Sequence, residues 1–183
     1  MNIKTAFLFT ILTLVVHIIR ISAQSTPTLN TLASATIVEV ITLSETTSMN
    51  FGTTLQTNHE GGTIILETNS NKRTYTGGLA SGGTTNQEAT NATFEVSGLS
   101  HANYTLILPA AITIEHTSID TGINTMEITA IKARFNGADA DATTSSIASN
   151  GTDSFTLGAT LNVQENQVFG LYSGTYSVSV DYN

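Results

Sequence analysis

One loop of the sequence carries the residue types that hold a hard cation. Residues 136–141 read Asn-Gly-Ala-Asp-Ala-Asp, so two carboxylates stand at alternate positions. Oxygen ligands of this kind bind calcium, and the candidate ligands are Asp139 and Asp141. An EF-hand loop that begins at Asp139 would need a glutamate where Asn150 stands. The alternative, a solvated hairpin loop without a metal, is the interpretation that the sequence favours.

The serines and histidines form no catalytic pattern. A hydrolase of the Gly-x-Ser-x-Gly type needs a sharp turn that exposes its serine, and that motif is absent from the sequence. Residues 98–101 (Gly-Leu-Ser-His) come nearest, but they lack the second glycine and fall in a predicted turn. His59, His101 and His116 are far apart and lack the spacing of metal ligands, which predicts surface positions. We therefore expect a non-enzymatic protein without catalytic residues or cofactors.

Charge and cysteine content exclude further kinds of partner and site. The chain has six basic residues, fourteen acidic residues and no cysteine. Nucleic acids and anionic membrane surfaces need clustered lysines and arginines, so neither is an expected partner. Without cysteine the chain forms no disulfide and no thiolate zinc site. A hydrophobic core must therefore supply the stability of the domain.

The N-terminus has the pattern of a secretory signal peptide. Lys4 precedes a mostly apolar run at residues 6–19, and residues 22–24 (Ser-Ala-Gln) offer a cleavage point. The competing interpretation is a membrane anchor, but the run is shorter than a spanning helix needs and Arg20 closes it. We expect a signal peptide at residues 1–23, a polar arm at residues 24–33 and one domain at residues 34–183, with no integral membrane span after cleavage.

Alternating apolar and polar residues dominate the rest of the chain. Phe155, Leu157, Leu161 and Val163 alternate with small or polar residues, and residues 176–182 repeat the pattern. Successive side chains of a strand point to opposite faces, so these apolar residues are predicted to face a core. Further strands are predicted at residues 36–43, 48–53, 62–68, 73–76, 93–97, 104–108, 112–116 and 126–135.

The alternation changes phase within residues 126–135. Met126 and Ile128 share one face, whereas Ala133 and Phe135 take over after it, so an inserted residue near Ala130 predicts a β-bulge. The longest loops are predicted at residues 77–91 and 136–153. About ten short strands without an amphipathic helix predict an all-β fold, an antiparallel two-sheet sandwich in a single domain.

A sugar-binding face would present a platform of aromatic rings. Most aromatic residues stand in the apolar phase of the predicted strands, which leaves Tyr75 and Tyr172 as the rings expected to be exposed. Two rings make a small platform, so the sequence does not identify a glycan site.

The C-terminal third carries a motif. Gln167, Gly170, Tyr172 and Gly174 stand in the order Gln-x-x-Gly-x-Tyr-x-Gly, before a final strand that ends in Tyr-Asn. In these residues the chain resembles a family of secreted bacterial proteins catalogued as domain of unknown function 4402, and weaker matches extend the resemblance over residues 34–183. It is also distantly similar to subunits of chaperone–usher pili, including the spore coat protein U type, but lacks the cysteine pairs common there.

The resemblance implies an immunoglobulin-like sandwich in the periplasm or on the outer surface of a Gram-negative-type bacterium, and it implies no catalytic residues. We expect a secreted or cell-surface structural or adhesive protein, with a pilus-like fibre subunit as its specific form. The alternative is a secreted monomer that binds a glycan or a protein. The expected partners are accordingly further copies of the chain, other surface proteins or glycans.

Overall fold

The computed structural model describes residues 27–183 except residues 53–54 and 82–88. Within this described part the regular secondary structure consists of β-strands alone, which confirms the all-β prediction. The described residues contain no helix that is long and apolar enough to cross a membrane. The predicted signal peptide, residues 1–23, lies outside the described residues.

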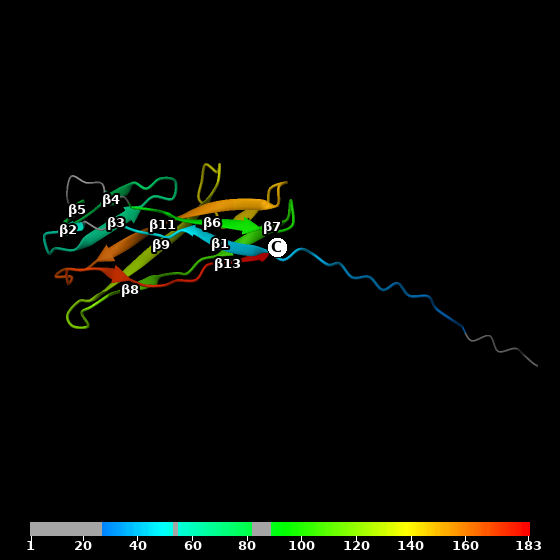
Figure 1. The fold of residues 1–183 in the computed structure, drawn as a ribbon, viewed down its shortest axis with the longest axis horizontal. Helices are drawn as coiled ribbons and strands as arrows, with labels where there is room; N and C mark the ends of the chain where they lie inside the picture. The colour runs from blue at the N-terminus through cyan, green and yellow to red at the C-terminus, as the bar shows by residue number, and fades with distance from the viewer. Residues whose placement is uncertain (1–26, 53–54, 82–88) are drawn as a thin grey trace, which may run out of the picture. The chain divides into compact units, whose positions relative to one another are not determined.

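Two antiparallel sheets form the sandwich (Figure 1). The first sheet has the order β1-β6-β11-β9-β8-β12, and β3 pairs with β11 and with β4 beside that path. The second sheet has the order β10-β7-β13, and a small ribbon pairs β2 with β5. The strands are β1 Thr42–Thr47, β2 Leu55–Thr57, β3 Gly62–Leu66, β4 Arg73–Tyr75, β5 Leu79–Ser81, β6 Ala92–Ser97, β7 Asn103–Ile107, β8 Ile112–His116, β9 Thr125–Phe135, β10 Thr144–Ser146, β11 Thr152–Val163, β12 Tyr172–Ser173 and β13 Ser179–Tyr182.

Strand β11 organises the first sheet. Along one edge it pairs first with β6 and then with β3, and along the other edge it pairs with β9. Its predicted core residues Phe155, Leu157 and Leu161 are buried, whereas Thr156 and Thr160 between them are half-buried. The alternation in the sequence therefore identified the inner face of this strand correctly.

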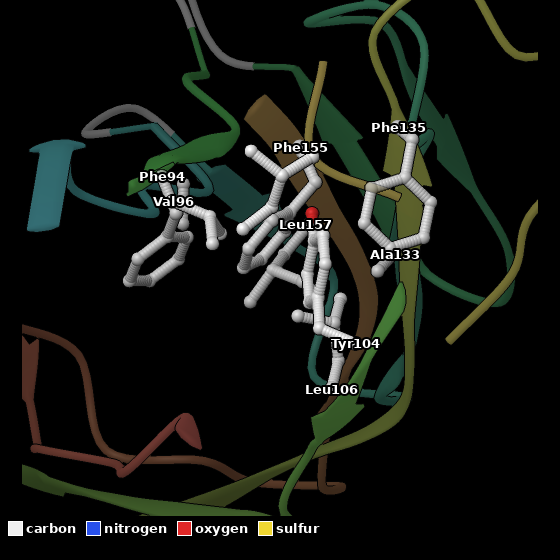
Figure 2. Close-up of a cluster of buried hydrophobic side chains, with 10 residues drawn as sticks. Phe94, Val96, Tyr104, Leu106, Ala133, Phe135, Phe155 and Leu157 are labelled. Atoms are coloured by element: carbon white, nitrogen blue, oxygen red, sulfur yellow. The ribbon is translucent and has the colours of Figure 1, made fainter. Parts of the chain in front are cut away.

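The core between the two sheets is rich in aromatic rings (Figure 2). Phe155 stacks on Phe94 with ring centroids 5.1 Å apart, and Phe135 meets Phe155 edge-on at 5.8 Å. Tyr104, which comes from β7 of the second sheet, is completely buried, and its hydroxyl donates a hydrogen bond of 2.8 Å to Asp153 of β11. Burial and this bond hold the pKa of Tyr104 far above its ordinary value. The bond ties the second sheet to the first.

A second core cluster lies farther along the first sheet, where β3, β8, β9 and β11 contribute Ile64, Ile112, Ile128 and Leu161. The predicted bulge in β9 is confirmed, because the pairing with β11 shifts register beside Ala130, whose φ is +49°. The extra residue lets both Ile128 and Phe135 point into core clusters, although their positions differ in parity.

The predicted strand boundaries fail in several places. The strand expected at residues 36–43 begins only at Thr42, and of the strand expected at residues 48–53 the described residues 48–52 contribute a single bridge, between Asn50 and Thr90. The short strands β2 and β12 have no counterpart in the prediction, and β5 and β10 fall inside predicted loops. Strands of two or three residues are too short to show a period, so their pairing depends on tertiary contacts.

Asn91 fastens the start of β6 to its neighbours. Its side chain is 6% exposed, and its Nδ2 donates to the carbonyl oxygens of Glu67 (2.6 Å) and Leu157 (2.8 Å). Both hydrogens of this buried amide are therefore used.

The chain divides into two units, residues 1–37 and residues 38–183. In the first unit, the described residues 27–37 form no helix or strand. Leu29, Leu32 and Ile37 expose 85%, 95% and 97% of their surface. This part of the chain therefore displays apolar side chains that its own unit leaves uncovered.

Candidate functional site

Ser100 and His101 occupy an exposed turn. Ser100 Oγ donates to the carbonyl oxygen of Ser149 at 3.3 Å, and the backbone N–H of His101 donates to that of Ile147 at 2.8 Å. His101 has a φ of +64°, so the residue serves the turn geometry. These contacts show that Ser100 and His101 stabilise a turn.

The three histidines lie apart from one another. His59 and His101 are exposed as predicted, but His116 is half-buried, so the prediction of a surface position is wrong for it. Among the residues that the structure describes, no group of three or more histidines and carboxylates is placed to hold a metal ion.

The predicted calcium ligands differ in their surroundings. Asp139 is exposed in the turn after β9, whereas the Asp141 carboxylate lies 2.8 Å from a guanidinium nitrogen of Arg134 and accepts a 2.6 Å bond from Thr68. Partial burial acts to raise the pKa of Asp141, but the bonds from Thr68 and Arg134 and the charges of Arg134 and Lys132 outweigh it, so the pKa lies below its ordinary value. A cation at this loop would compete with Arg134, and the preference for a loop without a metal stays a prediction.

A cleft of about 410 Å³, with polar and apolar side chains in its lining, opens beside the same loop, and we call it the polar cleft for its hydrogen-bonding side chains. Its lining includes the side-chain types that bind hydroxyl groups, contributed by Asn69, Thr93, Arg134, Asn136 and Ser154. The cleft lies over β6, β9 and β11 of the first sheet.

The C-terminal motif forms a latch, which we define as residues 164–174. Gln167 is 5% exposed, and its Nε2 lies 2.6 Å from the carbonyl oxygen of Ile123 and 2.8 Å from the hydroxyl of Tyr172. The Tyr172 hydroxyl in turn donates to the carbonyl oxygen of Val168 at 2.6 Å. These bonds fasten the latch to the loop between β8 and β9 and account for the glutamine and tyrosine of the motif.

His116 completes the latch. Its Nδ1 accepts hydrogen bonds from the backbone N–H groups of Ser118 (3.0 Å) and Ile119 (2.9 Å), so that nitrogen carries no proton. Nε2 therefore holds the proton and donates to the carbonyl oxygen of Phe169 at 3.0 Å. A β-carbon at Gly170 would collide with this ring, which explains the first glycine of the motif.

The second glycine of the motif has a similar explanation. A β-carbon at Gly174 would lie 2.5 Å from the carbonyl oxygen of Thr113 on β8. The backbone of the latch thus lies against β8 too closely for any side chain at this position.

Four exposed apolar residues lie in the latch and in the loop between β8 and β9, and we call them the pole patch: Ile119, Ile123, Phe169 and Leu171. Phe169 is 63% and Leu171 is 66% exposed, and His59 meets the Phe169 ring edge-on at 5.2 Å. The prediction of an exposed Tyr75 and Tyr172 is wrong, because both are half-buried. The alternation of apolar and polar residues could not reveal that Phe169 is exposed while Gln167 and Tyr172 point inward. Gln167 and Tyr172 are an odd number of positions apart, and such a spacing would place them on opposite faces of a regular strand.

Comparison with known proteins yields one match. A family model described as "Domain of unknown function (DUF4402)" matches residues 41–182, which include the whole sandwich and the latch. Neither the curated proteins nor the solved structures contain a significant match to the chain.

Proposed function

The chain belongs to the DUF4402 family, and we propose that it is a non-enzymatic structural or adhesive protein of the cell surface, working as the subunit of a fibre. The signal-peptide pattern of residues 1–23 supports export to the periplasm or the outer surface. A rigid sandwich without a cysteine suits a repeated building block, because its fold does not depend on oxidation.

One observation carries the proposal, namely the exposed apolar segment before β1. Leu29, Leu32 and Ile37 lie in a stretch without helix or strand, and β1 at its end is an edge strand of the first sheet. An extended segment of this kind adds to the open sheet edge of a neighbouring molecule through backbone hydrogen bonds, while its apolar side chains give affinity. The last strand, β13, is already paired with β7, so the N-terminal segment is the better donor.

The test is deletion of residues 24–33 from the mature protein. We expect light scattering and electron microscopy to show assemblies for the intact protein and monomers for the shortened one. A matched pair of variants separates apolar contact from chain length. Leu29→Ser with Leu32→Ser should weaken assembly, whereas Thr28→Ser with Thr31→Ser should not. Assemblies that survive the deletion would contradict strand donation.

A secreted monomer that binds a glycan is the second candidate, and the polar cleft beside residues 136–138 favours it. Arg134, Asn69 and Asn136 provide donors and acceptors suited to sugar hydroxyls. The test is a glycan array with the intact protein and with the double variant Asn69→Ala with Asn136→Ala. If the intact protein stays monomeric and binds a glycan that the variant does not bind, the glycan-binding monomer replaces the fibre subunit as the proposed function.

A further inference from the structure

The two edges of the first sheet differ in what covers them. Strand β1 ends the sheet on one side and also contacts β13 of the second sheet. Strand β12 ends the sheet on the other side, where its pairing partner is β8. Edge strands offer unpaired backbone groups to a further strand.

The backbone at β12 has the geometry of an acceptor. The carbonyl oxygen of Leu171 accepts a 2.9 Å bond from the N–H of Thr117, so Leu171 faces β8 with its backbone groups. Tyr172 is paired with His116, and the bond runs between their neighbours Leu171 and Thr117, so the backbone groups of Tyr172 face away from β8. An incoming strand would find these groups on the outer edge.

The pole patch adds apolar surface to this edge. Phe169 and Leu171 stand on either side of Gly170, just before β12, and are 63% and 66% exposed. Ile119, in the loop after β8, is 39% exposed, and its N–H donates to Nδ1 of His116. Nε2 of the same ring donates to the carbonyl oxygen of Phe169, so the ring links the two residues. The latch fixes this surface through Gln167, so little conformational freedom remains to be lost when a partner binds.

Charge selects the partner. Exposed carboxylates stand close to the patch along the chain and the sheet, because Asp120 follows Ile119, Glu115 is paired with Ser173 and Glu165 lies in the latch, and the whole chain has a formal charge of −8. Two such acidic surfaces repel each other when they meet face to face. Residues 25–38 contain no charged residue and expose Leu29, Leu32 and Ile37, so this segment can approach the patch without that repulsion.

We propose that the outer edge of β12 with the pole patch is the acceptor site for residues 27–38 of a second copy of the chain. The inference rests on the proposed fibre function and names its acceptor. The donor segment precedes β1 and the acceptor is β12, so donor and acceptor are different surfaces of the chain. The contact is therefore heterologous, and it leaves a free donor and a free acceptor at the two ends of every assembly, so the chain grows as an open fibre.

Cysteine cross-linking tests this site directly, because the natural chain has no cysteine. Leu32→Cys in one copy and Leu171→Cys in an affinity-tagged second copy are mixed under mild oxidation. The control acceptor is Ile107→Cys on the second sheet, which is 52% exposed against 66% for Leu171. We expect about tenfold more mixed disulfide with Leu171→Cys, since docking raises the local thiol concentration. Equal yields would overturn the site.

Assembly of the full mature chain gives the second test. Phe169→Ser with Leu171→Ser should lower fibre yield about tenfold, whereas Leu99→Ser with Ile107→Ser, two other exposed apolar positions, should leave it unchanged. Thermal unfolding verifies that each variant is folded. Fibres that need residues 24–33 but ignore the Phe169 and Leu171 changes would refute this acceptor and spare the proposed function. A wild-type protein that is always monomeric would refute both.

Discussion

The junction between the sheets and the latch are built in opposite ways. At the junction, Phe94, Phe135 and Phe155 are buried and the exposed faces of their strands are polar. At the latch, the amide of Gln167 is buried and the ring of Phe169 is exposed. Apolar burial stabilises the first region, whereas hydrogen bonds hold the second in one shape. This contrast indicates that the latch holds an exposed apolar surface, because a segment that served stability alone would turn its phenyl ring inward.

The largest effect expected from this contrast is in the junction. Phe155→Ala removes a ring that is 1% exposed and packed between Phe94 and Phe135, so it should lower the free energy of unfolding by about 3–5 kcal/mol. Thr156→Ala, next in the strand, is the matched control and should cost under about 1.5 kcal/mol. Urea unfolding measures both values. Similar small losses at the two positions would mean that the ring does not support the junction.

The latch should respond locally. Gln167→Ala removes the amide donor to the hydroxyl of Tyr172 and one of the donors to the carbonyl oxygen of Ile123, which keeps the bond from the N–H of Val168, so a loss of about 1–3 kcal/mol is expected. Hydrogen exchange should rise in residues 117–124 and 164–174 and stay unchanged in β6 and β11. Gln164→Ala, whose side chain is exposed, is the control. Uniformly faster exchange across the sandwich would show that the latch belongs to the global fold.

Alkaline pH should weaken the sheet junction before the latch. Burial, together with the charge of Glu45, raises the pKa of Tyr176 to about 12 from 10.0, and the pKa of Tyr104 is raised further. Both groups keep their protons in the folded state, so their contribution is complete below pH 10 and is lost as the pH rises through 12. Urea midpoints from pH 8 to pH 12 should fall above 10. Tyr176→Phe should flatten part of that decline, and an unchanged slope would contradict the raised pKa.

The smallest effect is expected at the loop after β9. Asp141→Asn removes the ion pair with Arg134, whose two side chains are partly exposed to solvent, so the loss of stability should be about 1 kcal/mol or less. Because folding lowers the pKa of Asp141 from its ordinary value of 3.8, its contribution to stability is complete above that ordinary value. The contribution disappears as the pH falls through the lowered pKa. Millimolar calcium should leave the melting temperature of the wild-type protein unchanged. A rise that Asp139→Asn abolishes would instead establish a calcium site.

Long alternating segments made most of the fold predictable. Residues 155–163 show their inner face in the sequence, and the change of phase around Ala130 revealed the bulge because the flanking apolar residues differ in parity. The start of β1 was not predictable, since Ile37 and Val38 are as apolar as strand residues and only tertiary pairing decides where the strand begins.

The candidate site was less accessible to prediction. The motif with Gln167 and Tyr172 stood out, but no periodic rule places a buried glutamine, because its position follows from carbonyl groups of a distant loop. Phe169 was expected in the core with the other aromatic residues and is exposed, because the backbone beside Gly170 passes over His116 and leaves no inward room.

Asn91 has a practical consequence for producing this protein. It begins the tripeptide Asn91-Ala92-Thr93, which is an acceptor signal for N-linked glycosylation in eukaryotic secretory pathways. An attached glycan would replace one hydrogen of Nδ2, and both hydrogens are engaged with Glu67 and Leu157 in a site that is 6% exposed. Oligosaccharide transfer during synthesis would therefore prevent β6 from seating against β11, so expression belongs in a bacterial host, where this modification does not precede folding.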